Sequence, residues 1–478
     1  MFWNRGFNVL TWEGVRDIVV DPDAVLSRAE LIAALSRALD LTEGEPMGHA
    51  MRACWIGMKI GQALELSLAE RKELYYGLLL KDAGCTANAQ QVSAWFGTDD
   101  RTAKYALKTV NWSNLWSATR YAMGQAKPGA PWHVRMQQMV SIGKRGPQAA
   151  RELVAMRCTR GADIVRRLGW ADLAPDAVLN LDEHWDGSGH PRGLKGEAIP
   201  ILARILSLAQ TVEFFWGRSG SNTARAIAEK RRGTWFDPQL VDIFLVLSRN
   251  ANFWQELRLV TSPRAIAQLD PAPSRISLTT MEQLLQVAHI FGEIVDSKTS
   301  WTAQHSVRTA DYAGKLAQIL GWDKRQQQDT VLAGFFHDLG KVGVSNLILD
   351  KPGPLDTKER QAIERHPELT FNILEPIAPL RSIAHVAASH HERLDGSGYY
   401  QHSSGSDIPG GGLVVAVADV FDALAHARPY RRQLNVDEVL ALMRKEKGSK
   451  LWAPAMDALE WGLAHRIIDA ADTDASGV

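Results

Sequence analysis

The sequence predicts an all-α protein built from two tandem copies of one helical-bundle domain. Apolar residues recur at helical spacing, as at Leu31, Leu35 and Leu39. A long internal repeat relates the two halves: Asp186-Gly-Ser-Gly and Asp395-Gly-Ser-Gly each begin a stretch that ends at an Ile-Pro pair, 14 positions after the aspartate. A repeat of this length decides the architecture, so we predict two copies of one domain.

Two further intervals support the same register. His49 precedes Asp82 by 33 positions, and the same 33 positions separate His305 from Asp338. The proline that ends each repeat lies 10 positions before Asp419 in the second copy and 10 positions before a glutamine in the first. Three matched intervals are hard to obtain by chance, and they align the two copies residue by residue.

The first copy is longer than the second. From Asp82 to Asp186 the chain runs 104 positions, against 57 from Asp338 to Asp395, so we expect an insertion within about 87–146. A stretch rich in Pro, Ser and Arg separates the copies and reads as a boundary. The predicted segments are an N-terminal tail (1–20), a degenerate first domain (21–255), a linker (256–278), a catalytic domain (279–470) and a C-terminal tail (471–478).

Composition is that of an ordinary globular protein, with 45% apolar and 23% charged residues in a chain of 478. Basic and acidic residues number 54 each, so bulk charge predicts attraction neither to DNA nor to a membrane surface. No apolar run is long enough to predict a membrane span. The three cysteines are odd in number and widely spaced, which favours a reducing compartment and predicts a cytoplasmic protein.

Residues suited to metal binding are concentrated in the second copy, since ten of the 14 histidines lie from His289 onward. His337 and Asp338 are adjacent and follow an apolar run, 331–336, that is typical of a buried helix end. A buried imidazole and carboxylate need a partner, and a metal ion is the strongest one available. The alternative is a His-Asp hydrogen bond at a helix terminus.

Further motif residues surround this pair in a fixed order. The set comprises His305, His337-Asp338, His366, His390-His391, Asp395-Gly-Ser-Gly-Tyr399 and Asp419. In this order it resembles the HD-GYP family of metal-dependent phosphodiesterases. The resemblance implies metal ligands at His305, His337, Asp338, His366, His390, His391 and Asp419.

Mixed imidazole and carboxylate ligands suit iron, manganese or zinc better than calcium, and we expect iron or manganese. Seven ligands exceed what one catalytic metal takes, so we expect two divalent ions, with Asp338 as the bridge that the family implies. Some family members bind a third ion through a glutamate four residues before the first histidine. Trp301 stands there in this chain, so the resemblance implies a dinuclear site.

Three cations are implied for the substrate. The family places a lysine at Lys341, beside the scissile phosphate, where its charge would stabilise the reaction together with catalytic Asp338. Arg428 and Arg431 resemble the residues that bind the substrate phosphate, a task that suits the guanidinium fork. The alternatives are a solvated lysine and a solvent-facing basic cluster.

The first copy lacks most of these ligands. Lys81 stands at the position of His337, and a protonated lysine has no lone pair to give. The remaining replacements are Leu181-Asp182 for His390-His391, Gln210 for Asp419 and, approximately, Cys158 for His366. We predict a non-catalytic domain that serves packing, dimerisation or regulation, or that only stabilises its neighbour.

The resemblance implies hydrolysis of a cyclic dinucleotide second messenger, and cyclic di-GMP is the expected substrate. Cyclic GMP-AMP or another phosphoester is the enzymatic alternative, and a non-hydrolytic receptor is the alternative of another class. The sequence reads Gly398-Tyr399-Tyr400 where the family has Gly-Tyr-Pro, which puts the rigidity of this loop in doubt. A homodimer and a signalling protein that binds this loop are the candidate protein partners.

Overall fold

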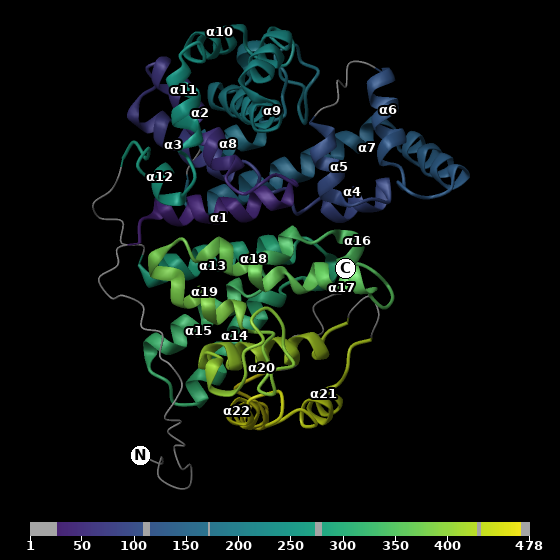
Figure 1. Ribbon diagram of the computed structural model, residues 1–478, viewed down its shortest axis with the longest axis vertical. Helices are drawn as coiled ribbons and strands as arrows, with labels where there is room; N and C mark the ends of the chain where they lie inside the picture. Colours follow the sequence, from purple (N-terminus) through teal and green to yellow (C-terminus); the bar gives the residue numbers. More distant parts are fainter. Residues whose placement is uncertain (1–25, 109–114, 171–172, 273–279, 428–431, 470–478) are drawn as a thin grey trace.

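The computed structural model describes residues 26–108, 115–170, 173–272, 280–427 and 432–469. Within these ranges the secondary structure is helical, with two isolated bridges, Arg232 with Phe236 and Lys447 with Leu451, and no β-strand. Figure 1 shows two helical bodies, one formed by the purple-to-teal first half and one by the green-to-yellow second half. The predicted all-α fold with two tandem domains is therefore confirmed.

The first body contains a bundle and an additional group of helices. Its helices are α1 (Arg28–Thr42), α2 (His49–Ala63), α3 (Leu68–Leu80), α4 (Ala89–Phe96), α5 (Asp100–Leu107), α6 (Leu115–Gln125), α7 (Trp132–Arg167), α8 (Leu173–Leu179), η1 (Gly196–Ala198), α9 (Ile201–Lys230), α10 (Pro238–Leu247), α11 (Ala251–Arg258) and α12 (Pro263–Ala267). The predicted insertion range, 87–146, contains α4, α5, α6 and the beginning of α7.

The second body repeats the bundle without that group. Its helices are α13 (Met281–Asp296), η2 (Ser300–Thr302), α14 (His305–Ile319), α15 (Lys324–Phe336), η3 (Leu339–Gly343), α16 (Asn346–Leu349), α17 (Thr357–Glu364), α18 (His366–Leu374), η4 (Ala378–Leu380), α19 (Arg381–Ala388), η5 (Gly405–Asp407), α20 (Gly410–Ala425), α21 (Val436–Met443) and α22 (Ala453–Ala464). None of the helices in the described ranges is long and apolar enough to cross a membrane.

Local sequence signals explain why the two bundles match. The α2 and α14 helices are both 15 residues long, and each begins at a histidine. The α3 and α15 helices are both 13 residues long, and each begins with a capping box, made by Ser67 with Glu70 and by Asp323 with Gln326. A capping box satisfies backbone N–H groups that the first helical turn leaves unpaired. The repeat therefore extends to the signals that start the helices.

Close backbone approaches fix the register of the site helices. A Cβ atom on Gly340 would lie 2.0 Å from the carbonyl oxygen of His366, so only glycine lets η3 approach α18 this closely. In the first copy a Cβ atom on Gly84 would lie 1.9 Å from the carbonyl oxygen of Arg157. Arg157 therefore holds the place of His366, and the approximate assignment of Cys158 to that place was wrong by one residue.

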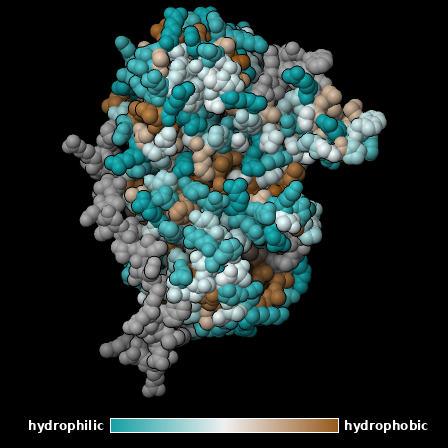
Figure 2. Space-filling view, in the orientation of Figure 1, coloured by the Kyte–Doolittle hydropathy of each residue, from teal (hydrophilic) through white to brown (hydrophobic). Residues whose placement is uncertain are grey.

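The two bodies pack directly against each other. The α1 helix lies along the boundary, facing α13 and α18 (Figure 1). Figure 2 shows hydrophobic residues along this boundary, while most of the visible outer surface is hydrophilic. Part of the predicted linker also packs onto the first body, because the hydroxyl of Tyr75 donates to the carbonyl oxygen of Ile266 in α12 at 3.1 Å.

Candidate metal centre

The second body gathers all seven predicted ligand side chains at one point. They come from helix ends and from one helix interior, and all are buried except His391, which is half-buried. They are His305 at the start of α14, His337 and Asp338 after α15, His366 at the start of α18, His390 and His391 after α19, and Asp419 in α20. Residues far apart in the sequence thus converge on Asp338.

Asp338 faces two groups of histidines with its two oxygen atoms. Its Oδ1 lies 3.4 Å from Nε2 of His366 and 3.8 Å from Nε2 of His390. Its Oδ2 lies 3.5 Å from Nε2 of His305 and 3.3 Å from Nε2 of His337. A carboxylate with histidines on both sides has the geometry of a bridge between two positions.

His391 and Asp419 complete one group each. The ligand atoms of His366, His390 and His391 all lie within 4.8 Å of one another. The same holds for the ligand atoms of His305, His337 and Asp419. His390 and His391 both follow the end of α19, and both lie in the same group.

Three of the histidines are oriented by backbone carbonyl groups of the helix that precedes them. Nδ1 of His337, of His366 and of His390 donates to the backbone carbonyl three residues earlier, at 2.7, 2.6 and 2.7 Å. Each of these residues follows the last turn of a helix, where backbone carbonyls lack intrahelical partners. A proton fixed on Nδ1 leaves the Nε2 lone pair directed into the site, as in metal-binding histidines generally.

His305 is oriented by a carboxylate that the sequence analysis missed. Asp422, fully buried in α20, lies 2.6 Å from Nδ1 of His305 through Oδ2 and 2.6 Å from Nε of Arg308 through Oδ1. Asp422 is one helical turn beyond Asp419, so both carboxylates reach the site from one face of α20.

The first copy contains a signal that could have identified this carboxylate. Glu213 stands at the position that the repeat assigns to Asp422, and it contacts Nδ1 of His49 and, at 2.6 Å, Nε of Arg52. The same histidine, acid and arginine therefore recur in both copies. Comparing the copies beyond the motif residues would have pointed to Asp422.

Burial keeps the imidazoles of His366, His390 and His391 neutral. Burial lowers the pKa of His366 to about 4 and lowers the pKa values of His390 and His391 well below the usual range. Burial alone would raise the pKa of Asp338, but its electrostatic interactions with His337 and Lys341 hold this pKa well below its usual range. A neutral imidazole beside an ionised carboxylate is the form in which both can donate lone pairs.

The predicted substrate residues are only partly described. Nζ of Lys341 lies 2.6 Å from Oδ2 of Asp338, and the Lys341 side chain is 19% exposed. Arg428 and Arg431 lie outside the described residues. A pocket of about 220 Å³ adjoins the site at His391. Its other lining residues are Arg393, Ser397, Gly398, Tyr399, Glu446 and Lys450.

The Gly398-Tyr399-Tyr400 loop is held in place although it lacks the motif proline. The carboxylate of Glu392 accepts the backbone N–H of Gln401 at 2.8 Å. The ring of Tyr399 lies 4.5 Å from the ring of His391, centroid to centroid. Tyr400 adopts a positive φ of 97°. The loop therefore forms one wall of the site.

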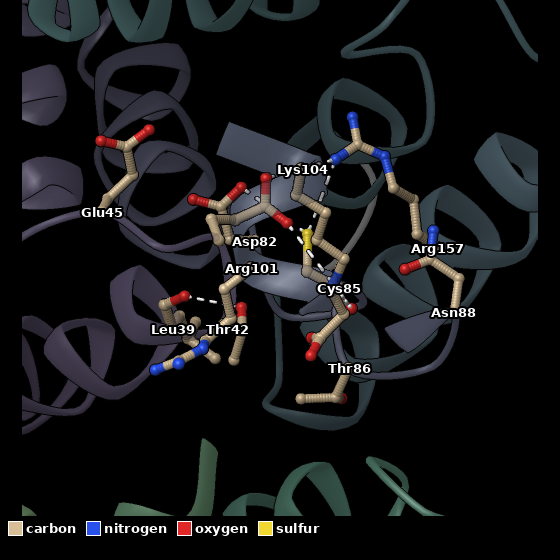
Figure 3. Close-up of polar contacts among 12 residues, drawn as sticks. Leu39, Thr42, Glu45, Asp82, Cys85, Thr86, Asn88, Arg101, Lys104 and Arg157 are labelled. Atoms are coloured by element: carbon tan, nitrogen blue, oxygen red, sulfur yellow. Dashed lines mark hydrogen bonds and ion pairs between the residues drawn. The ribbon is translucent and has the colours of Figure 1, made fainter. Parts of the chain in front are cut away.

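In the first copy, cations of the chain stand where the second copy has ligands. Lys81 contacts Asp82, and Arg157 contacts Asp182, the residue at the place of His391. Figure 3 shows Asp82 and Arg157 on either side of Cys85. At the positions of His337 and His366, the first copy thus has an ammonium and a guanidinium, and each neutralises a carboxylate.

The insertion adds two further cations to this cluster. Lys104 lies 3.8 Å and Lys108 lies 3.5 Å from Glu43, a buried acid beside Asp82 and Cys85. Burial also raises the pKa of the Cys85 thiol well above its usual range, so this sulfur stays protonated. A group surrounded by cations and containing a neutral thiol does not suit a divalent metal ion.

Comparison with known proteins places these features in a family. The sequence profile described as "HD domain" matches residues 78–240 and 289–454, one segment in each body. The chain is 40% identical to the 3'3'-cGAMP-specific phosphodiesterase 3 of Vibrio cholerae over 417 residues, which cover 87% of this chain and 90% of that protein. It is 34% identical to a cyclic di-GMP phosphodiesterase of Thermotoga maritima over 175 residues, or 36% of this chain and 47% of that protein.

A solved structure agrees with the sequence match that covers most of both chains. The crystal structure of a cyclic GMP-AMP-specific phosphodiesterase of V. cholerae superposes with a TM-score of 0.64 at 35% identity. The superposition covers 92% of this chain and 98% of the other. The similarity therefore includes both bodies.

Proposed function

Because this chain belongs to the HD domain family and is a metal-dependent phosphodiesterase of the HD-GYP type, we propose that its second body hydrolyses a 3′,3′-cyclic dinucleotide. The observation that carries this proposal is the arrangement around Asp338, whose two oxygen atoms face separate histidine groups. In the described residues, the corresponding region of the first body offers cations instead, so we assign catalysis to the second body alone.

The residues present in the second body fit divalent metal ions. Nε2 of His305, Nε2 of His337 and Oδ1 of Asp338 are buried, and none of them has a hydrogen-bond partner among the described residues. Leaving buried polar atoms unpaired is costly, so native structures rarely do so without a reason. A metal ion satisfies such atoms, and imidazole with carboxylate is a donor set that iron and manganese accept.

We assign two ions to the two groups. His366, His390 and His391 would hold one, His305, His337 and Asp419 would hold the other, and Asp338 would contact both. When bound, such ions supply Lewis-acid activation of water and neutralise the charge of the phosphate. Iron or manganese is our assignment for both.

The chain's own residues bind and orient the phosphate. Lys341 offers an ammonium at the solvent side of Asp338, where it can donate to a phosphate oxygen and offset the charge that develops there. We assign Arg428 and Arg431 to the same phosphate group, because they follow α20 directly and a guanidinium can hold two oxygen atoms at once. The half-buried ring of Tyr399 borders the pocket and offers a flat surface to a base.

The relatives favour one substrate over the other. The relative that matches 87% of this chain is named for 3'3'-cGAMP, whereas the cyclic di-GMP phosphodiesterase of T. maritima matches 36% of it. We therefore propose 3′,3′-cGAMP as the preferred substrate and cyclic di-GMP as the second. This order reverses the one expected from the sequence, where cyclic GMP-AMP was the alternative.

A hydrolysis assay with separated products tests the proposal. The full chain, loaded with manganese or iron, is incubated with equal concentrations of each cyclic dinucleotide, and the linear products are followed by chromatography. We expect linear dinucleotide from both, formed faster from 3′,3′-cGAMP. Tight binding of both nucleotides without any linear product would instead identify a receptor and contradict the proposed hydrolysis.

Three wider assignments remain proposals. We propose a cytoplasmic location, which suits the three free cysteines. A homodimer and a signalling protein at the Gly398-Tyr399-Tyr400 loop are the partners that we propose beside the nucleotide.

A further inference from the structure

The insertion in the first body reaches across the boundary to the loop that carries Lys341. Asp100, the first residue of α5, is fully buried although it is charged. Its Oδ2 lies 3.3 Å from Nζ of Lys298, which is 1% exposed and belongs to the second body. No role assigned to the first body so far explains this buried pair.

The pair holds the backbone that follows the catalytic motif. Nζ of Lys298 also donates to the carbonyl oxygen of Val342 at 3.1 Å. Oδ1 of Asp100 accepts the backbone N–H of Asn346 at 3.2 Å, and the side-chain amide of Asn346 donates to the carbonyl oxygen of Lys298 at 2.7 Å. Val342 lies in η3 and Asn346 begins α16, so the pair ties both to the first body.

The neighbouring residue of α5 makes a second contact to η3. Nη1 of Arg101 donates to the carbonyl oxygen of Gly343, while its Nη2 is held by Asp99 at 2.7 Å. Within η3, the N–H of Lys341 donates to the carbonyl of Asp338 at 2.8 Å. The first body therefore holds Gly343 directly, through Arg101, and Val342 indirectly, through the pair of Asp100 with Lys298. The hydrogen-bonded turn of Lys341 begins at Asp338, a proposed metal ligand.

Stability alone explains the buried pair poorly. Replacing a buried ion pair by apolar residues is often neutral or stabilising, so such a pair is weak evidence for a role in stability. It does impose a defined geometry on the groups that it contacts. Those groups here are backbone atoms of the segment that places one proposed catalytic cation.

We propose that Asp100 and Arg101 are positioning residues, through which the degenerate first body fixes η3 and thereby the ammonium of Lys341. The inference rests on the proposed function, because it assigns a purpose to the placement of Lys341. The insertion then has a defined role in catalysis, because it holds backbone of the second body in place.

Arg101→Ala is the first variant to test, because the Arg101 side chain is 29% exposed and its loss leaves no buried charge unpaired. We expect kcat on the preferred cyclic dinucleotide to fall about tenfold, since misplacing a catalytic group by about 1 Å can cost up to about a hundredfold. KM, bound metal and the unfolding temperature should stay close to wild type. Arg101→Lys, which keeps a donor, should recover part of the loss.

A double variant distinguishes positioning from a general structural effect. If Arg101 acts through Lys341, then Arg101→Ala should cause no further loss of kcat in a Lys341→Met background. An equal loss in both backgrounds would overturn the proposal. The matched control is Glu293→Gln, which breaks the ion pair of Glu293 with Arg167 across the same boundary and should leave kcat unchanged. The ion pairs that Glu293 makes among the described residues are with Arg160, Arg167 and His289, none of which belongs to η3.

Hydrogen exchange tests the proposal independently of activity. In the full chain, Arg101→Ala and Asp100→Asn should accelerate amide exchange in residues 339–344, while the other helices of the second body keep wild-type rates. Unchanged exchange there would overturn the inference even in an active enzyme. A wild-type chain that hydrolyses no cyclic dinucleotide would contradict the proposed function instead, and the exchange data would still decide whether the first body holds η3.

Discussion

Substituting Asp422 by asparagine should weaken metal binding without unfolding the protein. The carboxylate makes charge-assisted hydrogen bonds to both His305 and Arg308, each at 2.6 Å, and it is fully buried. Asparagine has nearly the same volume, but it has one acceptor oxygen in place of two, so one of these bonds must be lost. A hydrogen bond to a charged group is worth about 1.5–3 kcal/mol.

That energy predicts the size of the effect. Each 1.36 kcal/mol corresponds to a factor of ten, so we expect metal affinity to fall about ten- to a hundredfold. The affinity is measured by competition with a chelator of known strength, followed by elemental analysis of the protein fraction. The unfolding temperature, measured without metal, shows whether the fold persists.

The first copy supplies the matched control. Glu213 makes the same contacts to His49 and Arg52, but in a region where cations replace the ligands. Glu213→Gln should therefore leave the metal affinity at the wild-type value. Wild-type affinity in Asp422→Asn, or an equal loss in both variants, would refute the reasoning.

Three further predictions concern catalysis and pH. Lys341→Met should lower kcat about ten- to a hundredfold in steady-state assays with bound metal unchanged, and full activity would remove Lys341 from the mechanism. Arg428→Ala and Arg431→Ala should each reduce kcat/KM about ten- to a hundredfold, with partial rescue by lysine; undiminished activity in the double alanine variant would mean that the phosphate is held elsewhere. Burial raises the pKa of Asp40, in α1, to about 6. Between about pH 4 and pH 6 the folded state therefore keeps a proton that the unfolded state has lost, so the free energy of unfolding falls as the pH rises through this range. In urea unfolding, the stability advantage of wild type over Asp40→Asn should shrink by about 2–3 kcal/mol from pH 4 to pH 7, and a constant difference would contradict the raised pKa.

Local patterns in the sequence predicted most of the second body. The apolar run before His337 indicated a buried helix end, and α15 does end there. Threonine is a residue type that favours the N-cap position, and Thr280 caps α13. Such signals arise from residues that are close together in the chain, so a single sequence is enough to detect them. The seven ligand-type side chains do meet, while their role as ligands stays a prediction.

Contacts between distant residues could not be read in the same way. His305 and Asp422 are 117 positions apart, and Asp100 and Lys298 are 198 apart. Neither pair follows from periodicity, because each depends on how whole helices pack. A buried carboxylate such as Asp100 looks like a surface residue in the sequence, since charged residues are mostly exposed.

Elemental analysis of the full chain tests the central claim most directly. We predict about two divalent metal ions per chain in the wild type and a large loss in Asp338→Ala, because that carboxylate faces both histidine groups. Lys81→Ala, at the matching region of the first body, should leave the metal content unchanged. Undiminished metal in Asp338→Ala, or loss of metal in Lys81→Ala, would contradict a dinuclear centre confined to the second body.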